Sequence, residues 1–215
     1  MTAQLQNKDY EYTWKDSSLT NAHSFLLVPL LSMLPPPISD DGTPIKILDL
    51  GCGNGSVSNV LAQKGYQVLG IEESSQGITN ARQSFPKCEF MQASIYDLPY
   101  DQLTHSFDIV ISVEVIEHLF YPKELAKSAR KCLKPGGRLI LTTPYHSYLK
   151  NLALAATGKM DHHFHVLWDG GHIKFFSVKT LTNLLETEGH TDIQFKFAGR
   201  MPYLWKSMLS SCTPK

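Results

Sequence analysis

The sequence lacks an excess of either charge. Its 215 residues include 20 Lys and Arg against 20 Asp and Glu, so the formal net charge is zero. A dedicated nucleic-acid binder usually has a basic excess or a basic stripe, and neither is present here. The composition therefore argues against nucleic acid as the partner and favours a small molecule.

Long apolar runs and paired cysteines are also missing. The longest apolar run, 25–31, contains Pro29 and is too short for a transmembrane segment. The first twelve residues have no basic start followed by an apolar core, so we expect no signal peptide. The cysteines are scattered and form no CxxC pair: Cys52, Cys88, Cys132 and Cys212. We therefore expect reduced, mostly buried thiols in a cytoplasmic protein.

A glycine-rich turn is the most informative feature that the sequence does contain. A strand-like stretch at 45–49 leads into Gly51, Gly53 and Gly55, and a helical pattern begins near Val57. A strand that passes through such a turn into a helix brings backbone N–H groups close to a ligand. The pattern predicts a nucleotide-type site in an open α/β sheet.

Strand and helix patterns then alternate along the chain. After the first strand, strands are predicted at 67–71, 88–91, 107–113 and 138–143, with helices at 74–83 and 122–133. This alternation predicts an α/β fold with a doubly wound, mostly parallel sheet. A helix at 177–188 and strands at 192–197 and 207–213 follow, and we expect the two strands to form an antiparallel hairpin at the C-terminal end.

The spacing of the glycines bears on the ligand. The dinucleotide fingerprint is GxGxxG, whereas Gly51, Gly53 and Gly55 give GxGxG and Ser stands at position 56. This argues against a nicotinamide cofactor. Glu72 ends the second strand, where a carboxylate can accept hydrogen bonds from ribose hydroxyls and would repel a 2′-phosphate.

Five segments in order carry a resemblance to a known family: ILDLGCGNGS at 47–56, GIEES at 70–74, QASIYDLP at 92–99, FDIVISVEVIEHL at 107–119 and LKPGGRLILTTP at 133–144. Over about residues 45–200 the chain resembles the class I S-adenosylmethionine-dependent methyltransferases. The resemblance implies a Rossmann-like methyltransferase fold, S-adenosyl-L-methionine as cofactor and S-adenosylhomocysteine as product.

The resemblance also assigns roles around the glycine turn. It implies that Asp49 anchors the amino end of the methionine, directly through the turn or through a water. Gly51, Cys52 and Gly53 would pass close under the methionine and the ribose. Glu72 would bind the ribose hydroxyls.

Further positions are assigned to the adenine and the reacting methyl. Glu73 would pack beside the adenine, and Ser94 and Ile95 would meet its edge. Many relatives have Asp where this chain has Ser94, so we expect a weaker contact with the adenine amino group. Ser112 and Val113 would lie near the sulfonium.

The segment EVIEH carries the candidate catalytic residues. Glu114, Glu117 and His118 share one face if the segment is helical. They could supply a general base with its orienting partner, or ligands for a divalent metal. The segment is similar to that of the ubiquinone-pathway O-methyltransferases and the small-RNA 2′-O-methyltransferases, which implies a further histidine, for which His172 is well placed. The alternative is that Glu117 and His118 only satisfy backbone groups near the cofactor.

The sequence predicts two regions and one insert. Residues 1–43 are expected to form an N-terminal arm and a helix that cap the site, with Tyr12 and Trp14 either covering the cofactor or pinning the arm to the core. Residues 44–215 form the cofactor-binding domain, with a substrate lid at about 144–172.

The lid itself leaves several questions open. Residues 145–156 could form an amphipathic helix that packs on the domain, and peripheral membrane contact stays open. The three histidines that follow fit no standard zinc spacing, and we expect them to be exposed: His162, His163 and His165.

The preferred hypothesis is methyl transfer to a small-molecule acceptor, at an oxygen. Two alternatives remain at this stage: a metal-assisted RNA 2′-O-methyltransferase, and a catalytically silent domain that binds the cofactor. The sequence indicates neither the acceptor nor the oligomeric state.

Overall fold

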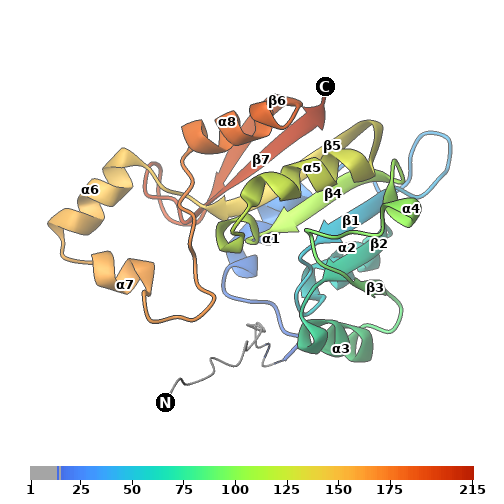
Figure 1. The fold of residues 1–215 in the computed structure, drawn as a ribbon, viewed down its shortest axis with the longest axis horizontal. Coiled ribbons are helices and arrows are strands. Elements are labelled where there is room, and N and C mark those ends of the chain that lie inside the picture. Colours follow the sequence, from blue (N-terminus) through green and yellow to red (C-terminus); the bar gives the residue numbers. More distant parts are fainter. Residues whose placement is uncertain (1–13, 15) are drawn as a thin grey trace, which may run out of the picture.

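A seven-stranded mixed sheet forms the centre of the protein (Figure 1). The computed structural model describes Trp14 and residues 16–215. The strand order is β3-β2-β1-β4-β5-β7-β6, with β1 to β5 parallel and β7 antiparallel to both of its neighbours. The strands are β1 (Lys46–Leu50), β2 (Gln67–Glu72), β3 (Glu89–Gln92), β4 (Phe107–Val113), β5 (Leu133–Pro144), β6 (His190–Ala198) and β7 (Ser207–Pro214).

Helices cover both faces of this sheet, so the predicted doubly wound α/β fold and the C-terminal antiparallel hairpin are confirmed. The helices are α1 (His23–Leu31), α2 (Ser56–Gln63), α3 (Ser75–Ser84), α4 (Tyr100–Leu103), the 3₁₀ turn η1 (Ile116–His118), α5 (Pro122–Cys132), α6 (Tyr148–Ala156), α7 (Met160–Phe164) and α8 (Val178–Thr187). Among the described residues, no helix combines the length and apolar character needed to cross a bilayer.

The strand β4 contributes side chains to the hydrophobic cores on both faces of the sheet. Its sequence is apolar almost throughout, as expected for a strand covered on both sides. Because successive side chains point to opposite faces, Val110 packs with residues of α5 and α8, whereas Ile109 and Ile111 pack with residues of α1 and α2. The sheet is therefore held from both sides and gives its strand ends fixed positions.

Two segments differ from the sequence prediction. The strand predicted at 138–143 begins earlier, at Leu133: pairing with β4 jumps from Leu133 to Arg138, so residues 134–137 form an irregular bulge inside the strand range. The insert after β5 contains α6, which falls within the helix expected at 145–156, and α7, which was not expected; both stand to one side of the sheet in Figure 1.

The strand order places a topological switch between β1 and β4. The chain runs from β1 outward to β3 and then returns to the other side of β1 with β4. Open α/β sheets bind ligands outside the carboxyl ends of the strands at such a switch. The glycine turn follows β1 and the EVIEH segment follows β4, so both predicted halves of the site start at this position.

Candidate active site

The glycine turn after β1 bends in a way that only glycine accommodates easily. The backbone N–H groups of Gly51 and Cys52 both donate to Ile71 O, at 2.8 and 2.9 Å. Gly51 has φ 77°, and a Cβ added there would lie 2.7 Å from a methyl carbon of Val115. The turn is therefore pressed against the segment that follows β4, and a side chain at Gly51 would separate the two.

Glu72 is fixed against the glycine turn by two backbone donors. Its Oε2 accepts from Gly53 N and its Oε1 accepts from Ser74 N, both at 2.9 Å. Burial raises the pKa of Glu72, and these hydrogen bonds oppose the rise. The oriented carboxylate fits the predicted ribose contact, while the neighbouring Glu73 is exposed and its carbonyl accepts from Gln92 Nε2.

Asp49 and Cys52 lie beneath the turn. Asp49 is buried and accepts a hydrogen bond from Ser58 Oγ at 2.6 Å. Burial raises its pKa to about 7, the Ser58 bond opposes this, and the charge of Glu72 adds to it. Burial also raises the pKa of the Cys52 thiol well above its usual value, so Cys52 is an unreactive packing residue. A buried acid in this position suits a cationic ligand.

The other predicted cofactor residues line the same edge. Ser94 Oγ accepts from Tyr96 N, and Ile95 is buried with its carbonyl accepting from Ser128 Oγ. Ser112 is buried and its hydroxyl donates to Leu50 O at 2.8 Å, which links β4 to β1. Half-buried Val113 ends β4. Contacts of these four residues with a cofactor stay predictions.

The N-terminal arm lies on the glycine turn. A Cβ added at Gly53 would overlap the indole ring of Trp14. Asn54 Nδ2 donates to Asp16 O and to Ser18 O, both at 2.9 Å, and Trp14 N donates to Gln76 Oε1. These contacts hold the arm against the glycine turn, in agreement with the expectation that Trp14 pins the arm to the core. Tyr12 lies outside the described residues.

Glu117, His118 and His172 form a compact group at the end of β4, the acid–histidine group. One ligand atom from each lies within 4.8 Å of the others. Glu117 is fully buried, its Oε2 accepts from Thr143 Oγ1 at 3.0 Å, and its Oε1 is 3.9 Å from His172 Nε2 without a hydrogen bond. The structure therefore brings together the three residues that the sequence analysis gave as candidate catalytic residues.

The environment sets the protonation of this group. Burial, reinforced by the nearby charge of Glu114, raises the pKa of Glu117 well above its usual value. Burial lowers the pKa of His172 to about 4 and also lowers that of His118. His118 Nδ1 lies 2.8 Å from Gly170 O, so it carries the ring proton and the lone pair is on Nε2. Two neutral imidazoles and a carboxyl group with an unbonded oxygen form a donor set that fits a divalent cation.

Glu114 lies near the acid–histidine group, but its carboxylate is held by other residues. Its oxygens accept from Thr142 Oγ1 at 2.9 Å and from Ser207 Oγ at 3.3 Å. The prediction that Glu114 shares a face with Glu117 and His118 assumed a helical turn. Its backbone instead has φ 55°, in the left-handed region, and helical geometry begins only at η1.

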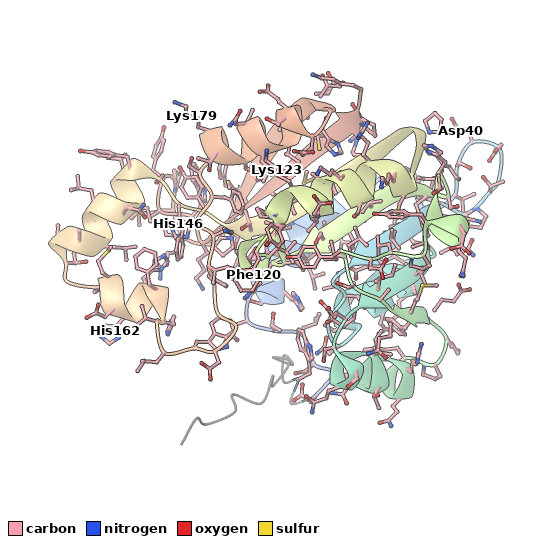
Figure 2. All side chains as sticks on the ribbon, in the orientation of Figure 1. Asp40, Phe120, Lys123, His146, His162 and Lys179 are labelled. Carbon is pink, nitrogen blue, oxygen red and sulfur yellow. The ribbon has the colours of Figure 1, made fainter. Side chains whose placement is uncertain are left out.

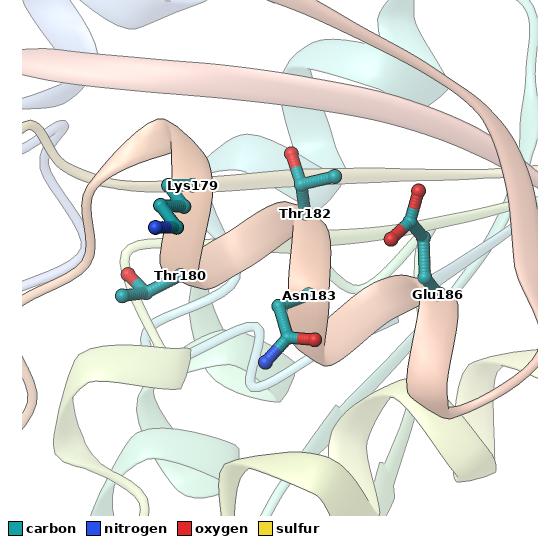
Figure 3. A pocket seen from close by; sticks show the side chains of 5 residues that line it. All are labelled: Lys179, Thr180, Thr182, Asn183 and Glu186. Atoms are coloured by element: carbon teal, nitrogen blue, oxygen red, sulfur yellow. The ribbon is translucent and has the colours of Figure 1, made fainter.

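Side chains at other places did not enter the sequence prediction. Thr143, at the end of β5, holds Glu117, and Lys150 of α6 is buried beside the same strand ends. A hollow on the outer side of α8, shown in Figure 3, is lined only by residues away from this edge: Lys179, Thr180, Thr182, Asn183 and Glu186.

Comparison with known families agrees with this geometry. Residues 22–194 match a family model described as a methyltransferase domain. The chain belongs to this methyltransferase family. The predicted resemblance to methyltransferases is confirmed, and the matched residues include both the glycine turn and the acid–histidine group.

Curated relatives add a more specific likeness. A ubiquinone biosynthesis O-methyltransferase of Idiomarina loihiensis is 37% identical over 102 residues, which cover 46% of this chain and 42% of that protein. A mitochondrial ubiquinone biosynthesis O-methyltransferase of Schizosaccharomyces pombe is 30% identical over 152 residues, covering 66% of this chain and 54% of that protein. The chain thus spans about half the length of the curated relatives it matches.

Solved structures support the fold. A protein of Pyrococcus horikoshii superposes with a TM-score of 0.66 at 22% identity and covers 88% of each chain. The magnesium protoporphyrin IX methyltransferase of Synechocystis, crystallised with S-adenosylhomocysteine, superposes with a TM-score of 0.63 at 20% identity, covering 88% of this chain and 80% of that one. Identities this low establish the shared architecture alone.

Proposed function

We propose that the protein transfers a methyl group from S-adenosyl-L-methionine to a hydroxyl oxygen of a small molecule. One observation carries this proposal: Gly51 of the cofactor turn packs on Val115, two residues before Glu117. The predicted cofactor site and the acid–histidine group are therefore direct neighbours. The names of the curated relatives, O-methyltransferases of ubiquinone biosynthesis, support an oxygen acceptor.

The cofactor half of the mechanism consists of binding and orientation. When bound, S-adenosyl-L-methionine supplies a methyl group already activated on a sulfonium. Glu72 binds the ribose hydroxyls through a carboxylate that Gly53 N and Ser74 N hold in place. Asp49 places a buried carboxyl group beneath the turn, and its ionised form attracts a cationic ligand.

The acceptor half concerns the proton of the hydroxyl. His118 Nε2 and His172 are neutral and can accept this proton as the oxygen attacks. Glu117 lies beside His172, with Oε1 3.9 Å from His172 Nε2. The same three residues fit a divalent cation, which would polarise the hydroxyl when bound. Both readings place proton removal at this group.

A binding experiment tests the cofactor half. S-adenosylhomocysteine should bind the protein with measurable heat at micromolar concentrations. Because Glu72 holds the turn and His118 faces the acceptor, Glu72→Ala should weaken this binding by more than tenfold and His118→Ala by less than threefold. Isothermal titration calorimetry measures both variants. If His118→Ala weakened binding more than Glu72→Ala, the assignment of the cofactor to the side of Glu72 would be wrong. No binding at all to the wild type would refute the proposed function.

Chelation decides between the two readings of the acid–histidine group. If a cation is used, methyl transfer to a catechol should stop in EDTA, because the chelator removes the cation from its carboxylate and imidazole ligands. Activity should return when Mg²⁺ or Mn²⁺ is added. The variant Glu117→Gln should then need more metal for half-maximal rate. Full activity in EDTA would leave the histidines as the base without a metal.

Specific observations weigh against the alternatives. The formal net charge of zero gives no support to an RNA substrate. A silent cofactor-binding domain needs no buried acid beside two neutral histidines. The cytoplasmic location, the division at residue 43 and a membrane contact of the lid stay predictions.

A further inference from the structure

Another hollow lies at the end of the sheet opposite the candidate active site. Its volume is about 390 Å³, within the range of about 300–1,000 Å³ that is usual for small-molecule sites. It is bordered by the last turn of α5, the start of β5, the residues between α4 and β4, and the end of β7. In Figure 1 these segments lie on the side of the molecule away from α6 and α7. The seven residues of β4 separate the hollow from the acid–histidine group, a distance of about 20 Å along the strand.

Cations outnumber acids around this basic hollow. Its lining contains the side chains of Arg130, Lys131, Lys134 and Lys215, and no Asp or Glu of the described residues lines it. Asp108 adjoins it and pairs with Lys134 at 2.7 Å. Even with Lys215 left aside, three cations against this one acid leave a charge of +2. A chain whose formal net charge is zero thus concentrates positive charge at this place.

Ion pairs do not engage Arg130 and Lys131. Within the part of the chain that the structure describes, no carboxylate oxygen lies within 4 Å of the charged nitrogens of either side chain. Lys131 Nζ lies over the ring of Tyr100, 4.3 Å from its centroid. Glu188, an acid at the end of α8, pairs with Lys123 at 3.6 Å. Both cations of the last turn of α5 therefore keep their charge available to a ligand.

Capping of α5 does not account for these cations. Basic side chains often bind the carbonyl groups in the last turn of a helix. Here backbone donors of the neighbouring loop take that role, since His105 N donates to Lys131 O at 2.9 Å. Ser106 N donates to Cys132 O at 3.0 Å, and His105 Nδ1 lies 2.8 Å from Leu133 O. The side chains of the last turn are thus not needed to satisfy the end of the helix.

Gly189 brings the Arg130 side chain and the end of β7 to one place. A Cβ added at Gly189 would lie 3.5 Å from Arg130 Cδ and 3.6 Å from its Nε. Lys215 N donates to Gly189 O at 2.9 Å. Pro135 and Pro214 add apolar rings to the lining. Charged groups and apolar rings in one hollow suit an anion that carries an organic group.

We propose that the basic hollow binds the phosphate monoester of a small organic molecule. Near pH 7 such a phosphate carries about −1.5 to −2 charges, which matches the excess of +2. The guanidinium of Arg130 can donate two parallel hydrogen bonds to phosphate oxygens, and the lysines add point charges. The organic part contacts Pro135 and Pro214. This site is separate from the acceptor's place, so the proposal does not rest on the proposed function.

Calorimetry with phenyl phosphate tests the proposal in the full chain. Phenyl phosphate should bind at least tenfold more tightly than phenyl sulfate, which has nearly the same shape but a single charge. Inorganic phosphate should bind more weakly than phenyl phosphate, because it lacks the apolar contacts. Arg130→Gln should weaken phenyl phosphate at least tenfold, since it removes both the charge and the paired donors. Saturation with S-adenosylhomocysteine should leave the affinity unchanged, because the cofactor binds at the other end of the sheet.

Charge variants at other places are the controls. Lys179→Gln removes one charge from the hollow of Figure 3, which has a volume of about 500 Å³ and also contains Glu186. Figure 2 shows Lys179 at the start of α8. Arg200→Gln removes a cation that lies near Lys150 on the acceptor side. Both variants should bind phenyl phosphate within twofold of the wild type.

Further variants separate recognition from folding. Arg130 is exposed, so Arg130→Gln should keep the circular dichroism spectrum of the wild type. If it does not, Lys131→Gln, at the next exposed position, should weaken phenyl phosphate at least threefold. Arg130→Lys keeps the charge but not the paired donors, and it should lose less affinity than Arg130→Gln.

Several outcomes would overturn the proposal. No binding of phenyl phosphate, or equal binding of phenyl phosphate and phenyl sulfate, would do so. An affinity that survives Arg130→Gln, or that falls as far in Arg200→Gln, would place the ligand elsewhere. Sedimentation with vesicles that contain phosphatidic acid, without binding of phenyl phosphate, would assign the monoester to a lipid and exclude the small molecule. Failure to bind S-adenosylhomocysteine would refute the proposed function alone.

Discussion

Gly53 joins three parts of the site through a single backbone position. Its N–H donates to Glu72, its φ of 56° lies in the left-handed region, and the place of a Cβ is filled by the indole of Trp14. Any side chain must therefore displace either the arm or the turn. The effect of a substitution at Gly53 should appear mainly in cofactor binding, because the same N–H positions the carboxylate of Glu72.

We expect Gly53→Ala to lower affinity for S-adenosylhomocysteine at least tenfold. Alanine in the left-handed region costs about 1–2 kcal/mol, and the added methyl group would also overlap Trp14. Gly42→Ala is the matched control, since Gly42 has φ 84° and nothing within 4 Å of an added Cβ. It should share the backbone cost in urea unfolding yet bind the ligand normally. Equal affinities in the two variants would contradict the role of Gly53.

At the scale of elements, α8 shows what local sequence can determine. The helix predicted at 177–188 begins with a capping box, in which Thr180 N donates to Ser177 Oγ and Ser177 N donates to Thr180 Oγ1. Such a cap needs only residues three positions apart. The buried face, Leu181, Leu184 and Leu185, follows helical spacing. Cap and spacing together account for the position of α8 on the sheet.

Loss of this cap should cost stability without touching the site. Ser177→Ala is expected to lower the free energy of unfolding by about 1 kcal/mol, because Thr180 N loses its acceptor, Ser177 Oγ, at the helix start. Urea unfolding followed by circular dichroism measures this. Asn183→Ala on the exposed side of α8 should change it by less than about 0.5 kcal/mol. A larger effect of Asn183→Ala would mean that the hollow in Figure 3 has a structural role.

The sequence predicts features that are determined by neighbouring residues, and it does not predict features that depend on contacts between distant elements. The bounds 107–113 of β4 follow from one apolar run, and the helix predicted at 74–83 agrees with α3 to within one residue at each end. The direction of Glu114 depends on Thr142 and Ser207, which come from other strands, and on a left-handed backbone that no local pattern indicates. No sequence pattern singles out Lys150, whose burial follows from its packing against the backbone of Tyr145 and Lys206.

At the scale of the whole molecule, the net charge of zero conceals a division. Buried acids gather at the cofactor turn, where Asp49 is 1% exposed and Glu72 holds Gly53. Cations gather in the insert and near β7, where Lys150 and Arg200 lie. A sulfonium cofactor would meet the opposite charge at the turn, whereas the acceptor side holds these cations together with the acids Glu114 and Glu117.

This division predicts that S-adenosyl-L-methionine binding releases protons near pH 7. Burial raises the pKa of Asp49 to about 7, so about half of the free protein carries this proton at that pH. A bound cation favours the ionised carboxylate and lowers the pKa, which expels the proton. Because the deprotonated form binds better, affinity should rise as pH increases from 6 to 8.

Calorimetry in phosphate and in Tris measures this release, since the two buffers differ in ionisation enthalpy. The wild type should release up to about half a proton at pH 7 through Asp49. Asp49→Asn keeps the shape of the side chain and should remove most of the release and flatten the pH dependence. Proton uptake on binding, or the same release from Asp49→Asn, would show that the buried acids do not respond to the cofactor's charge.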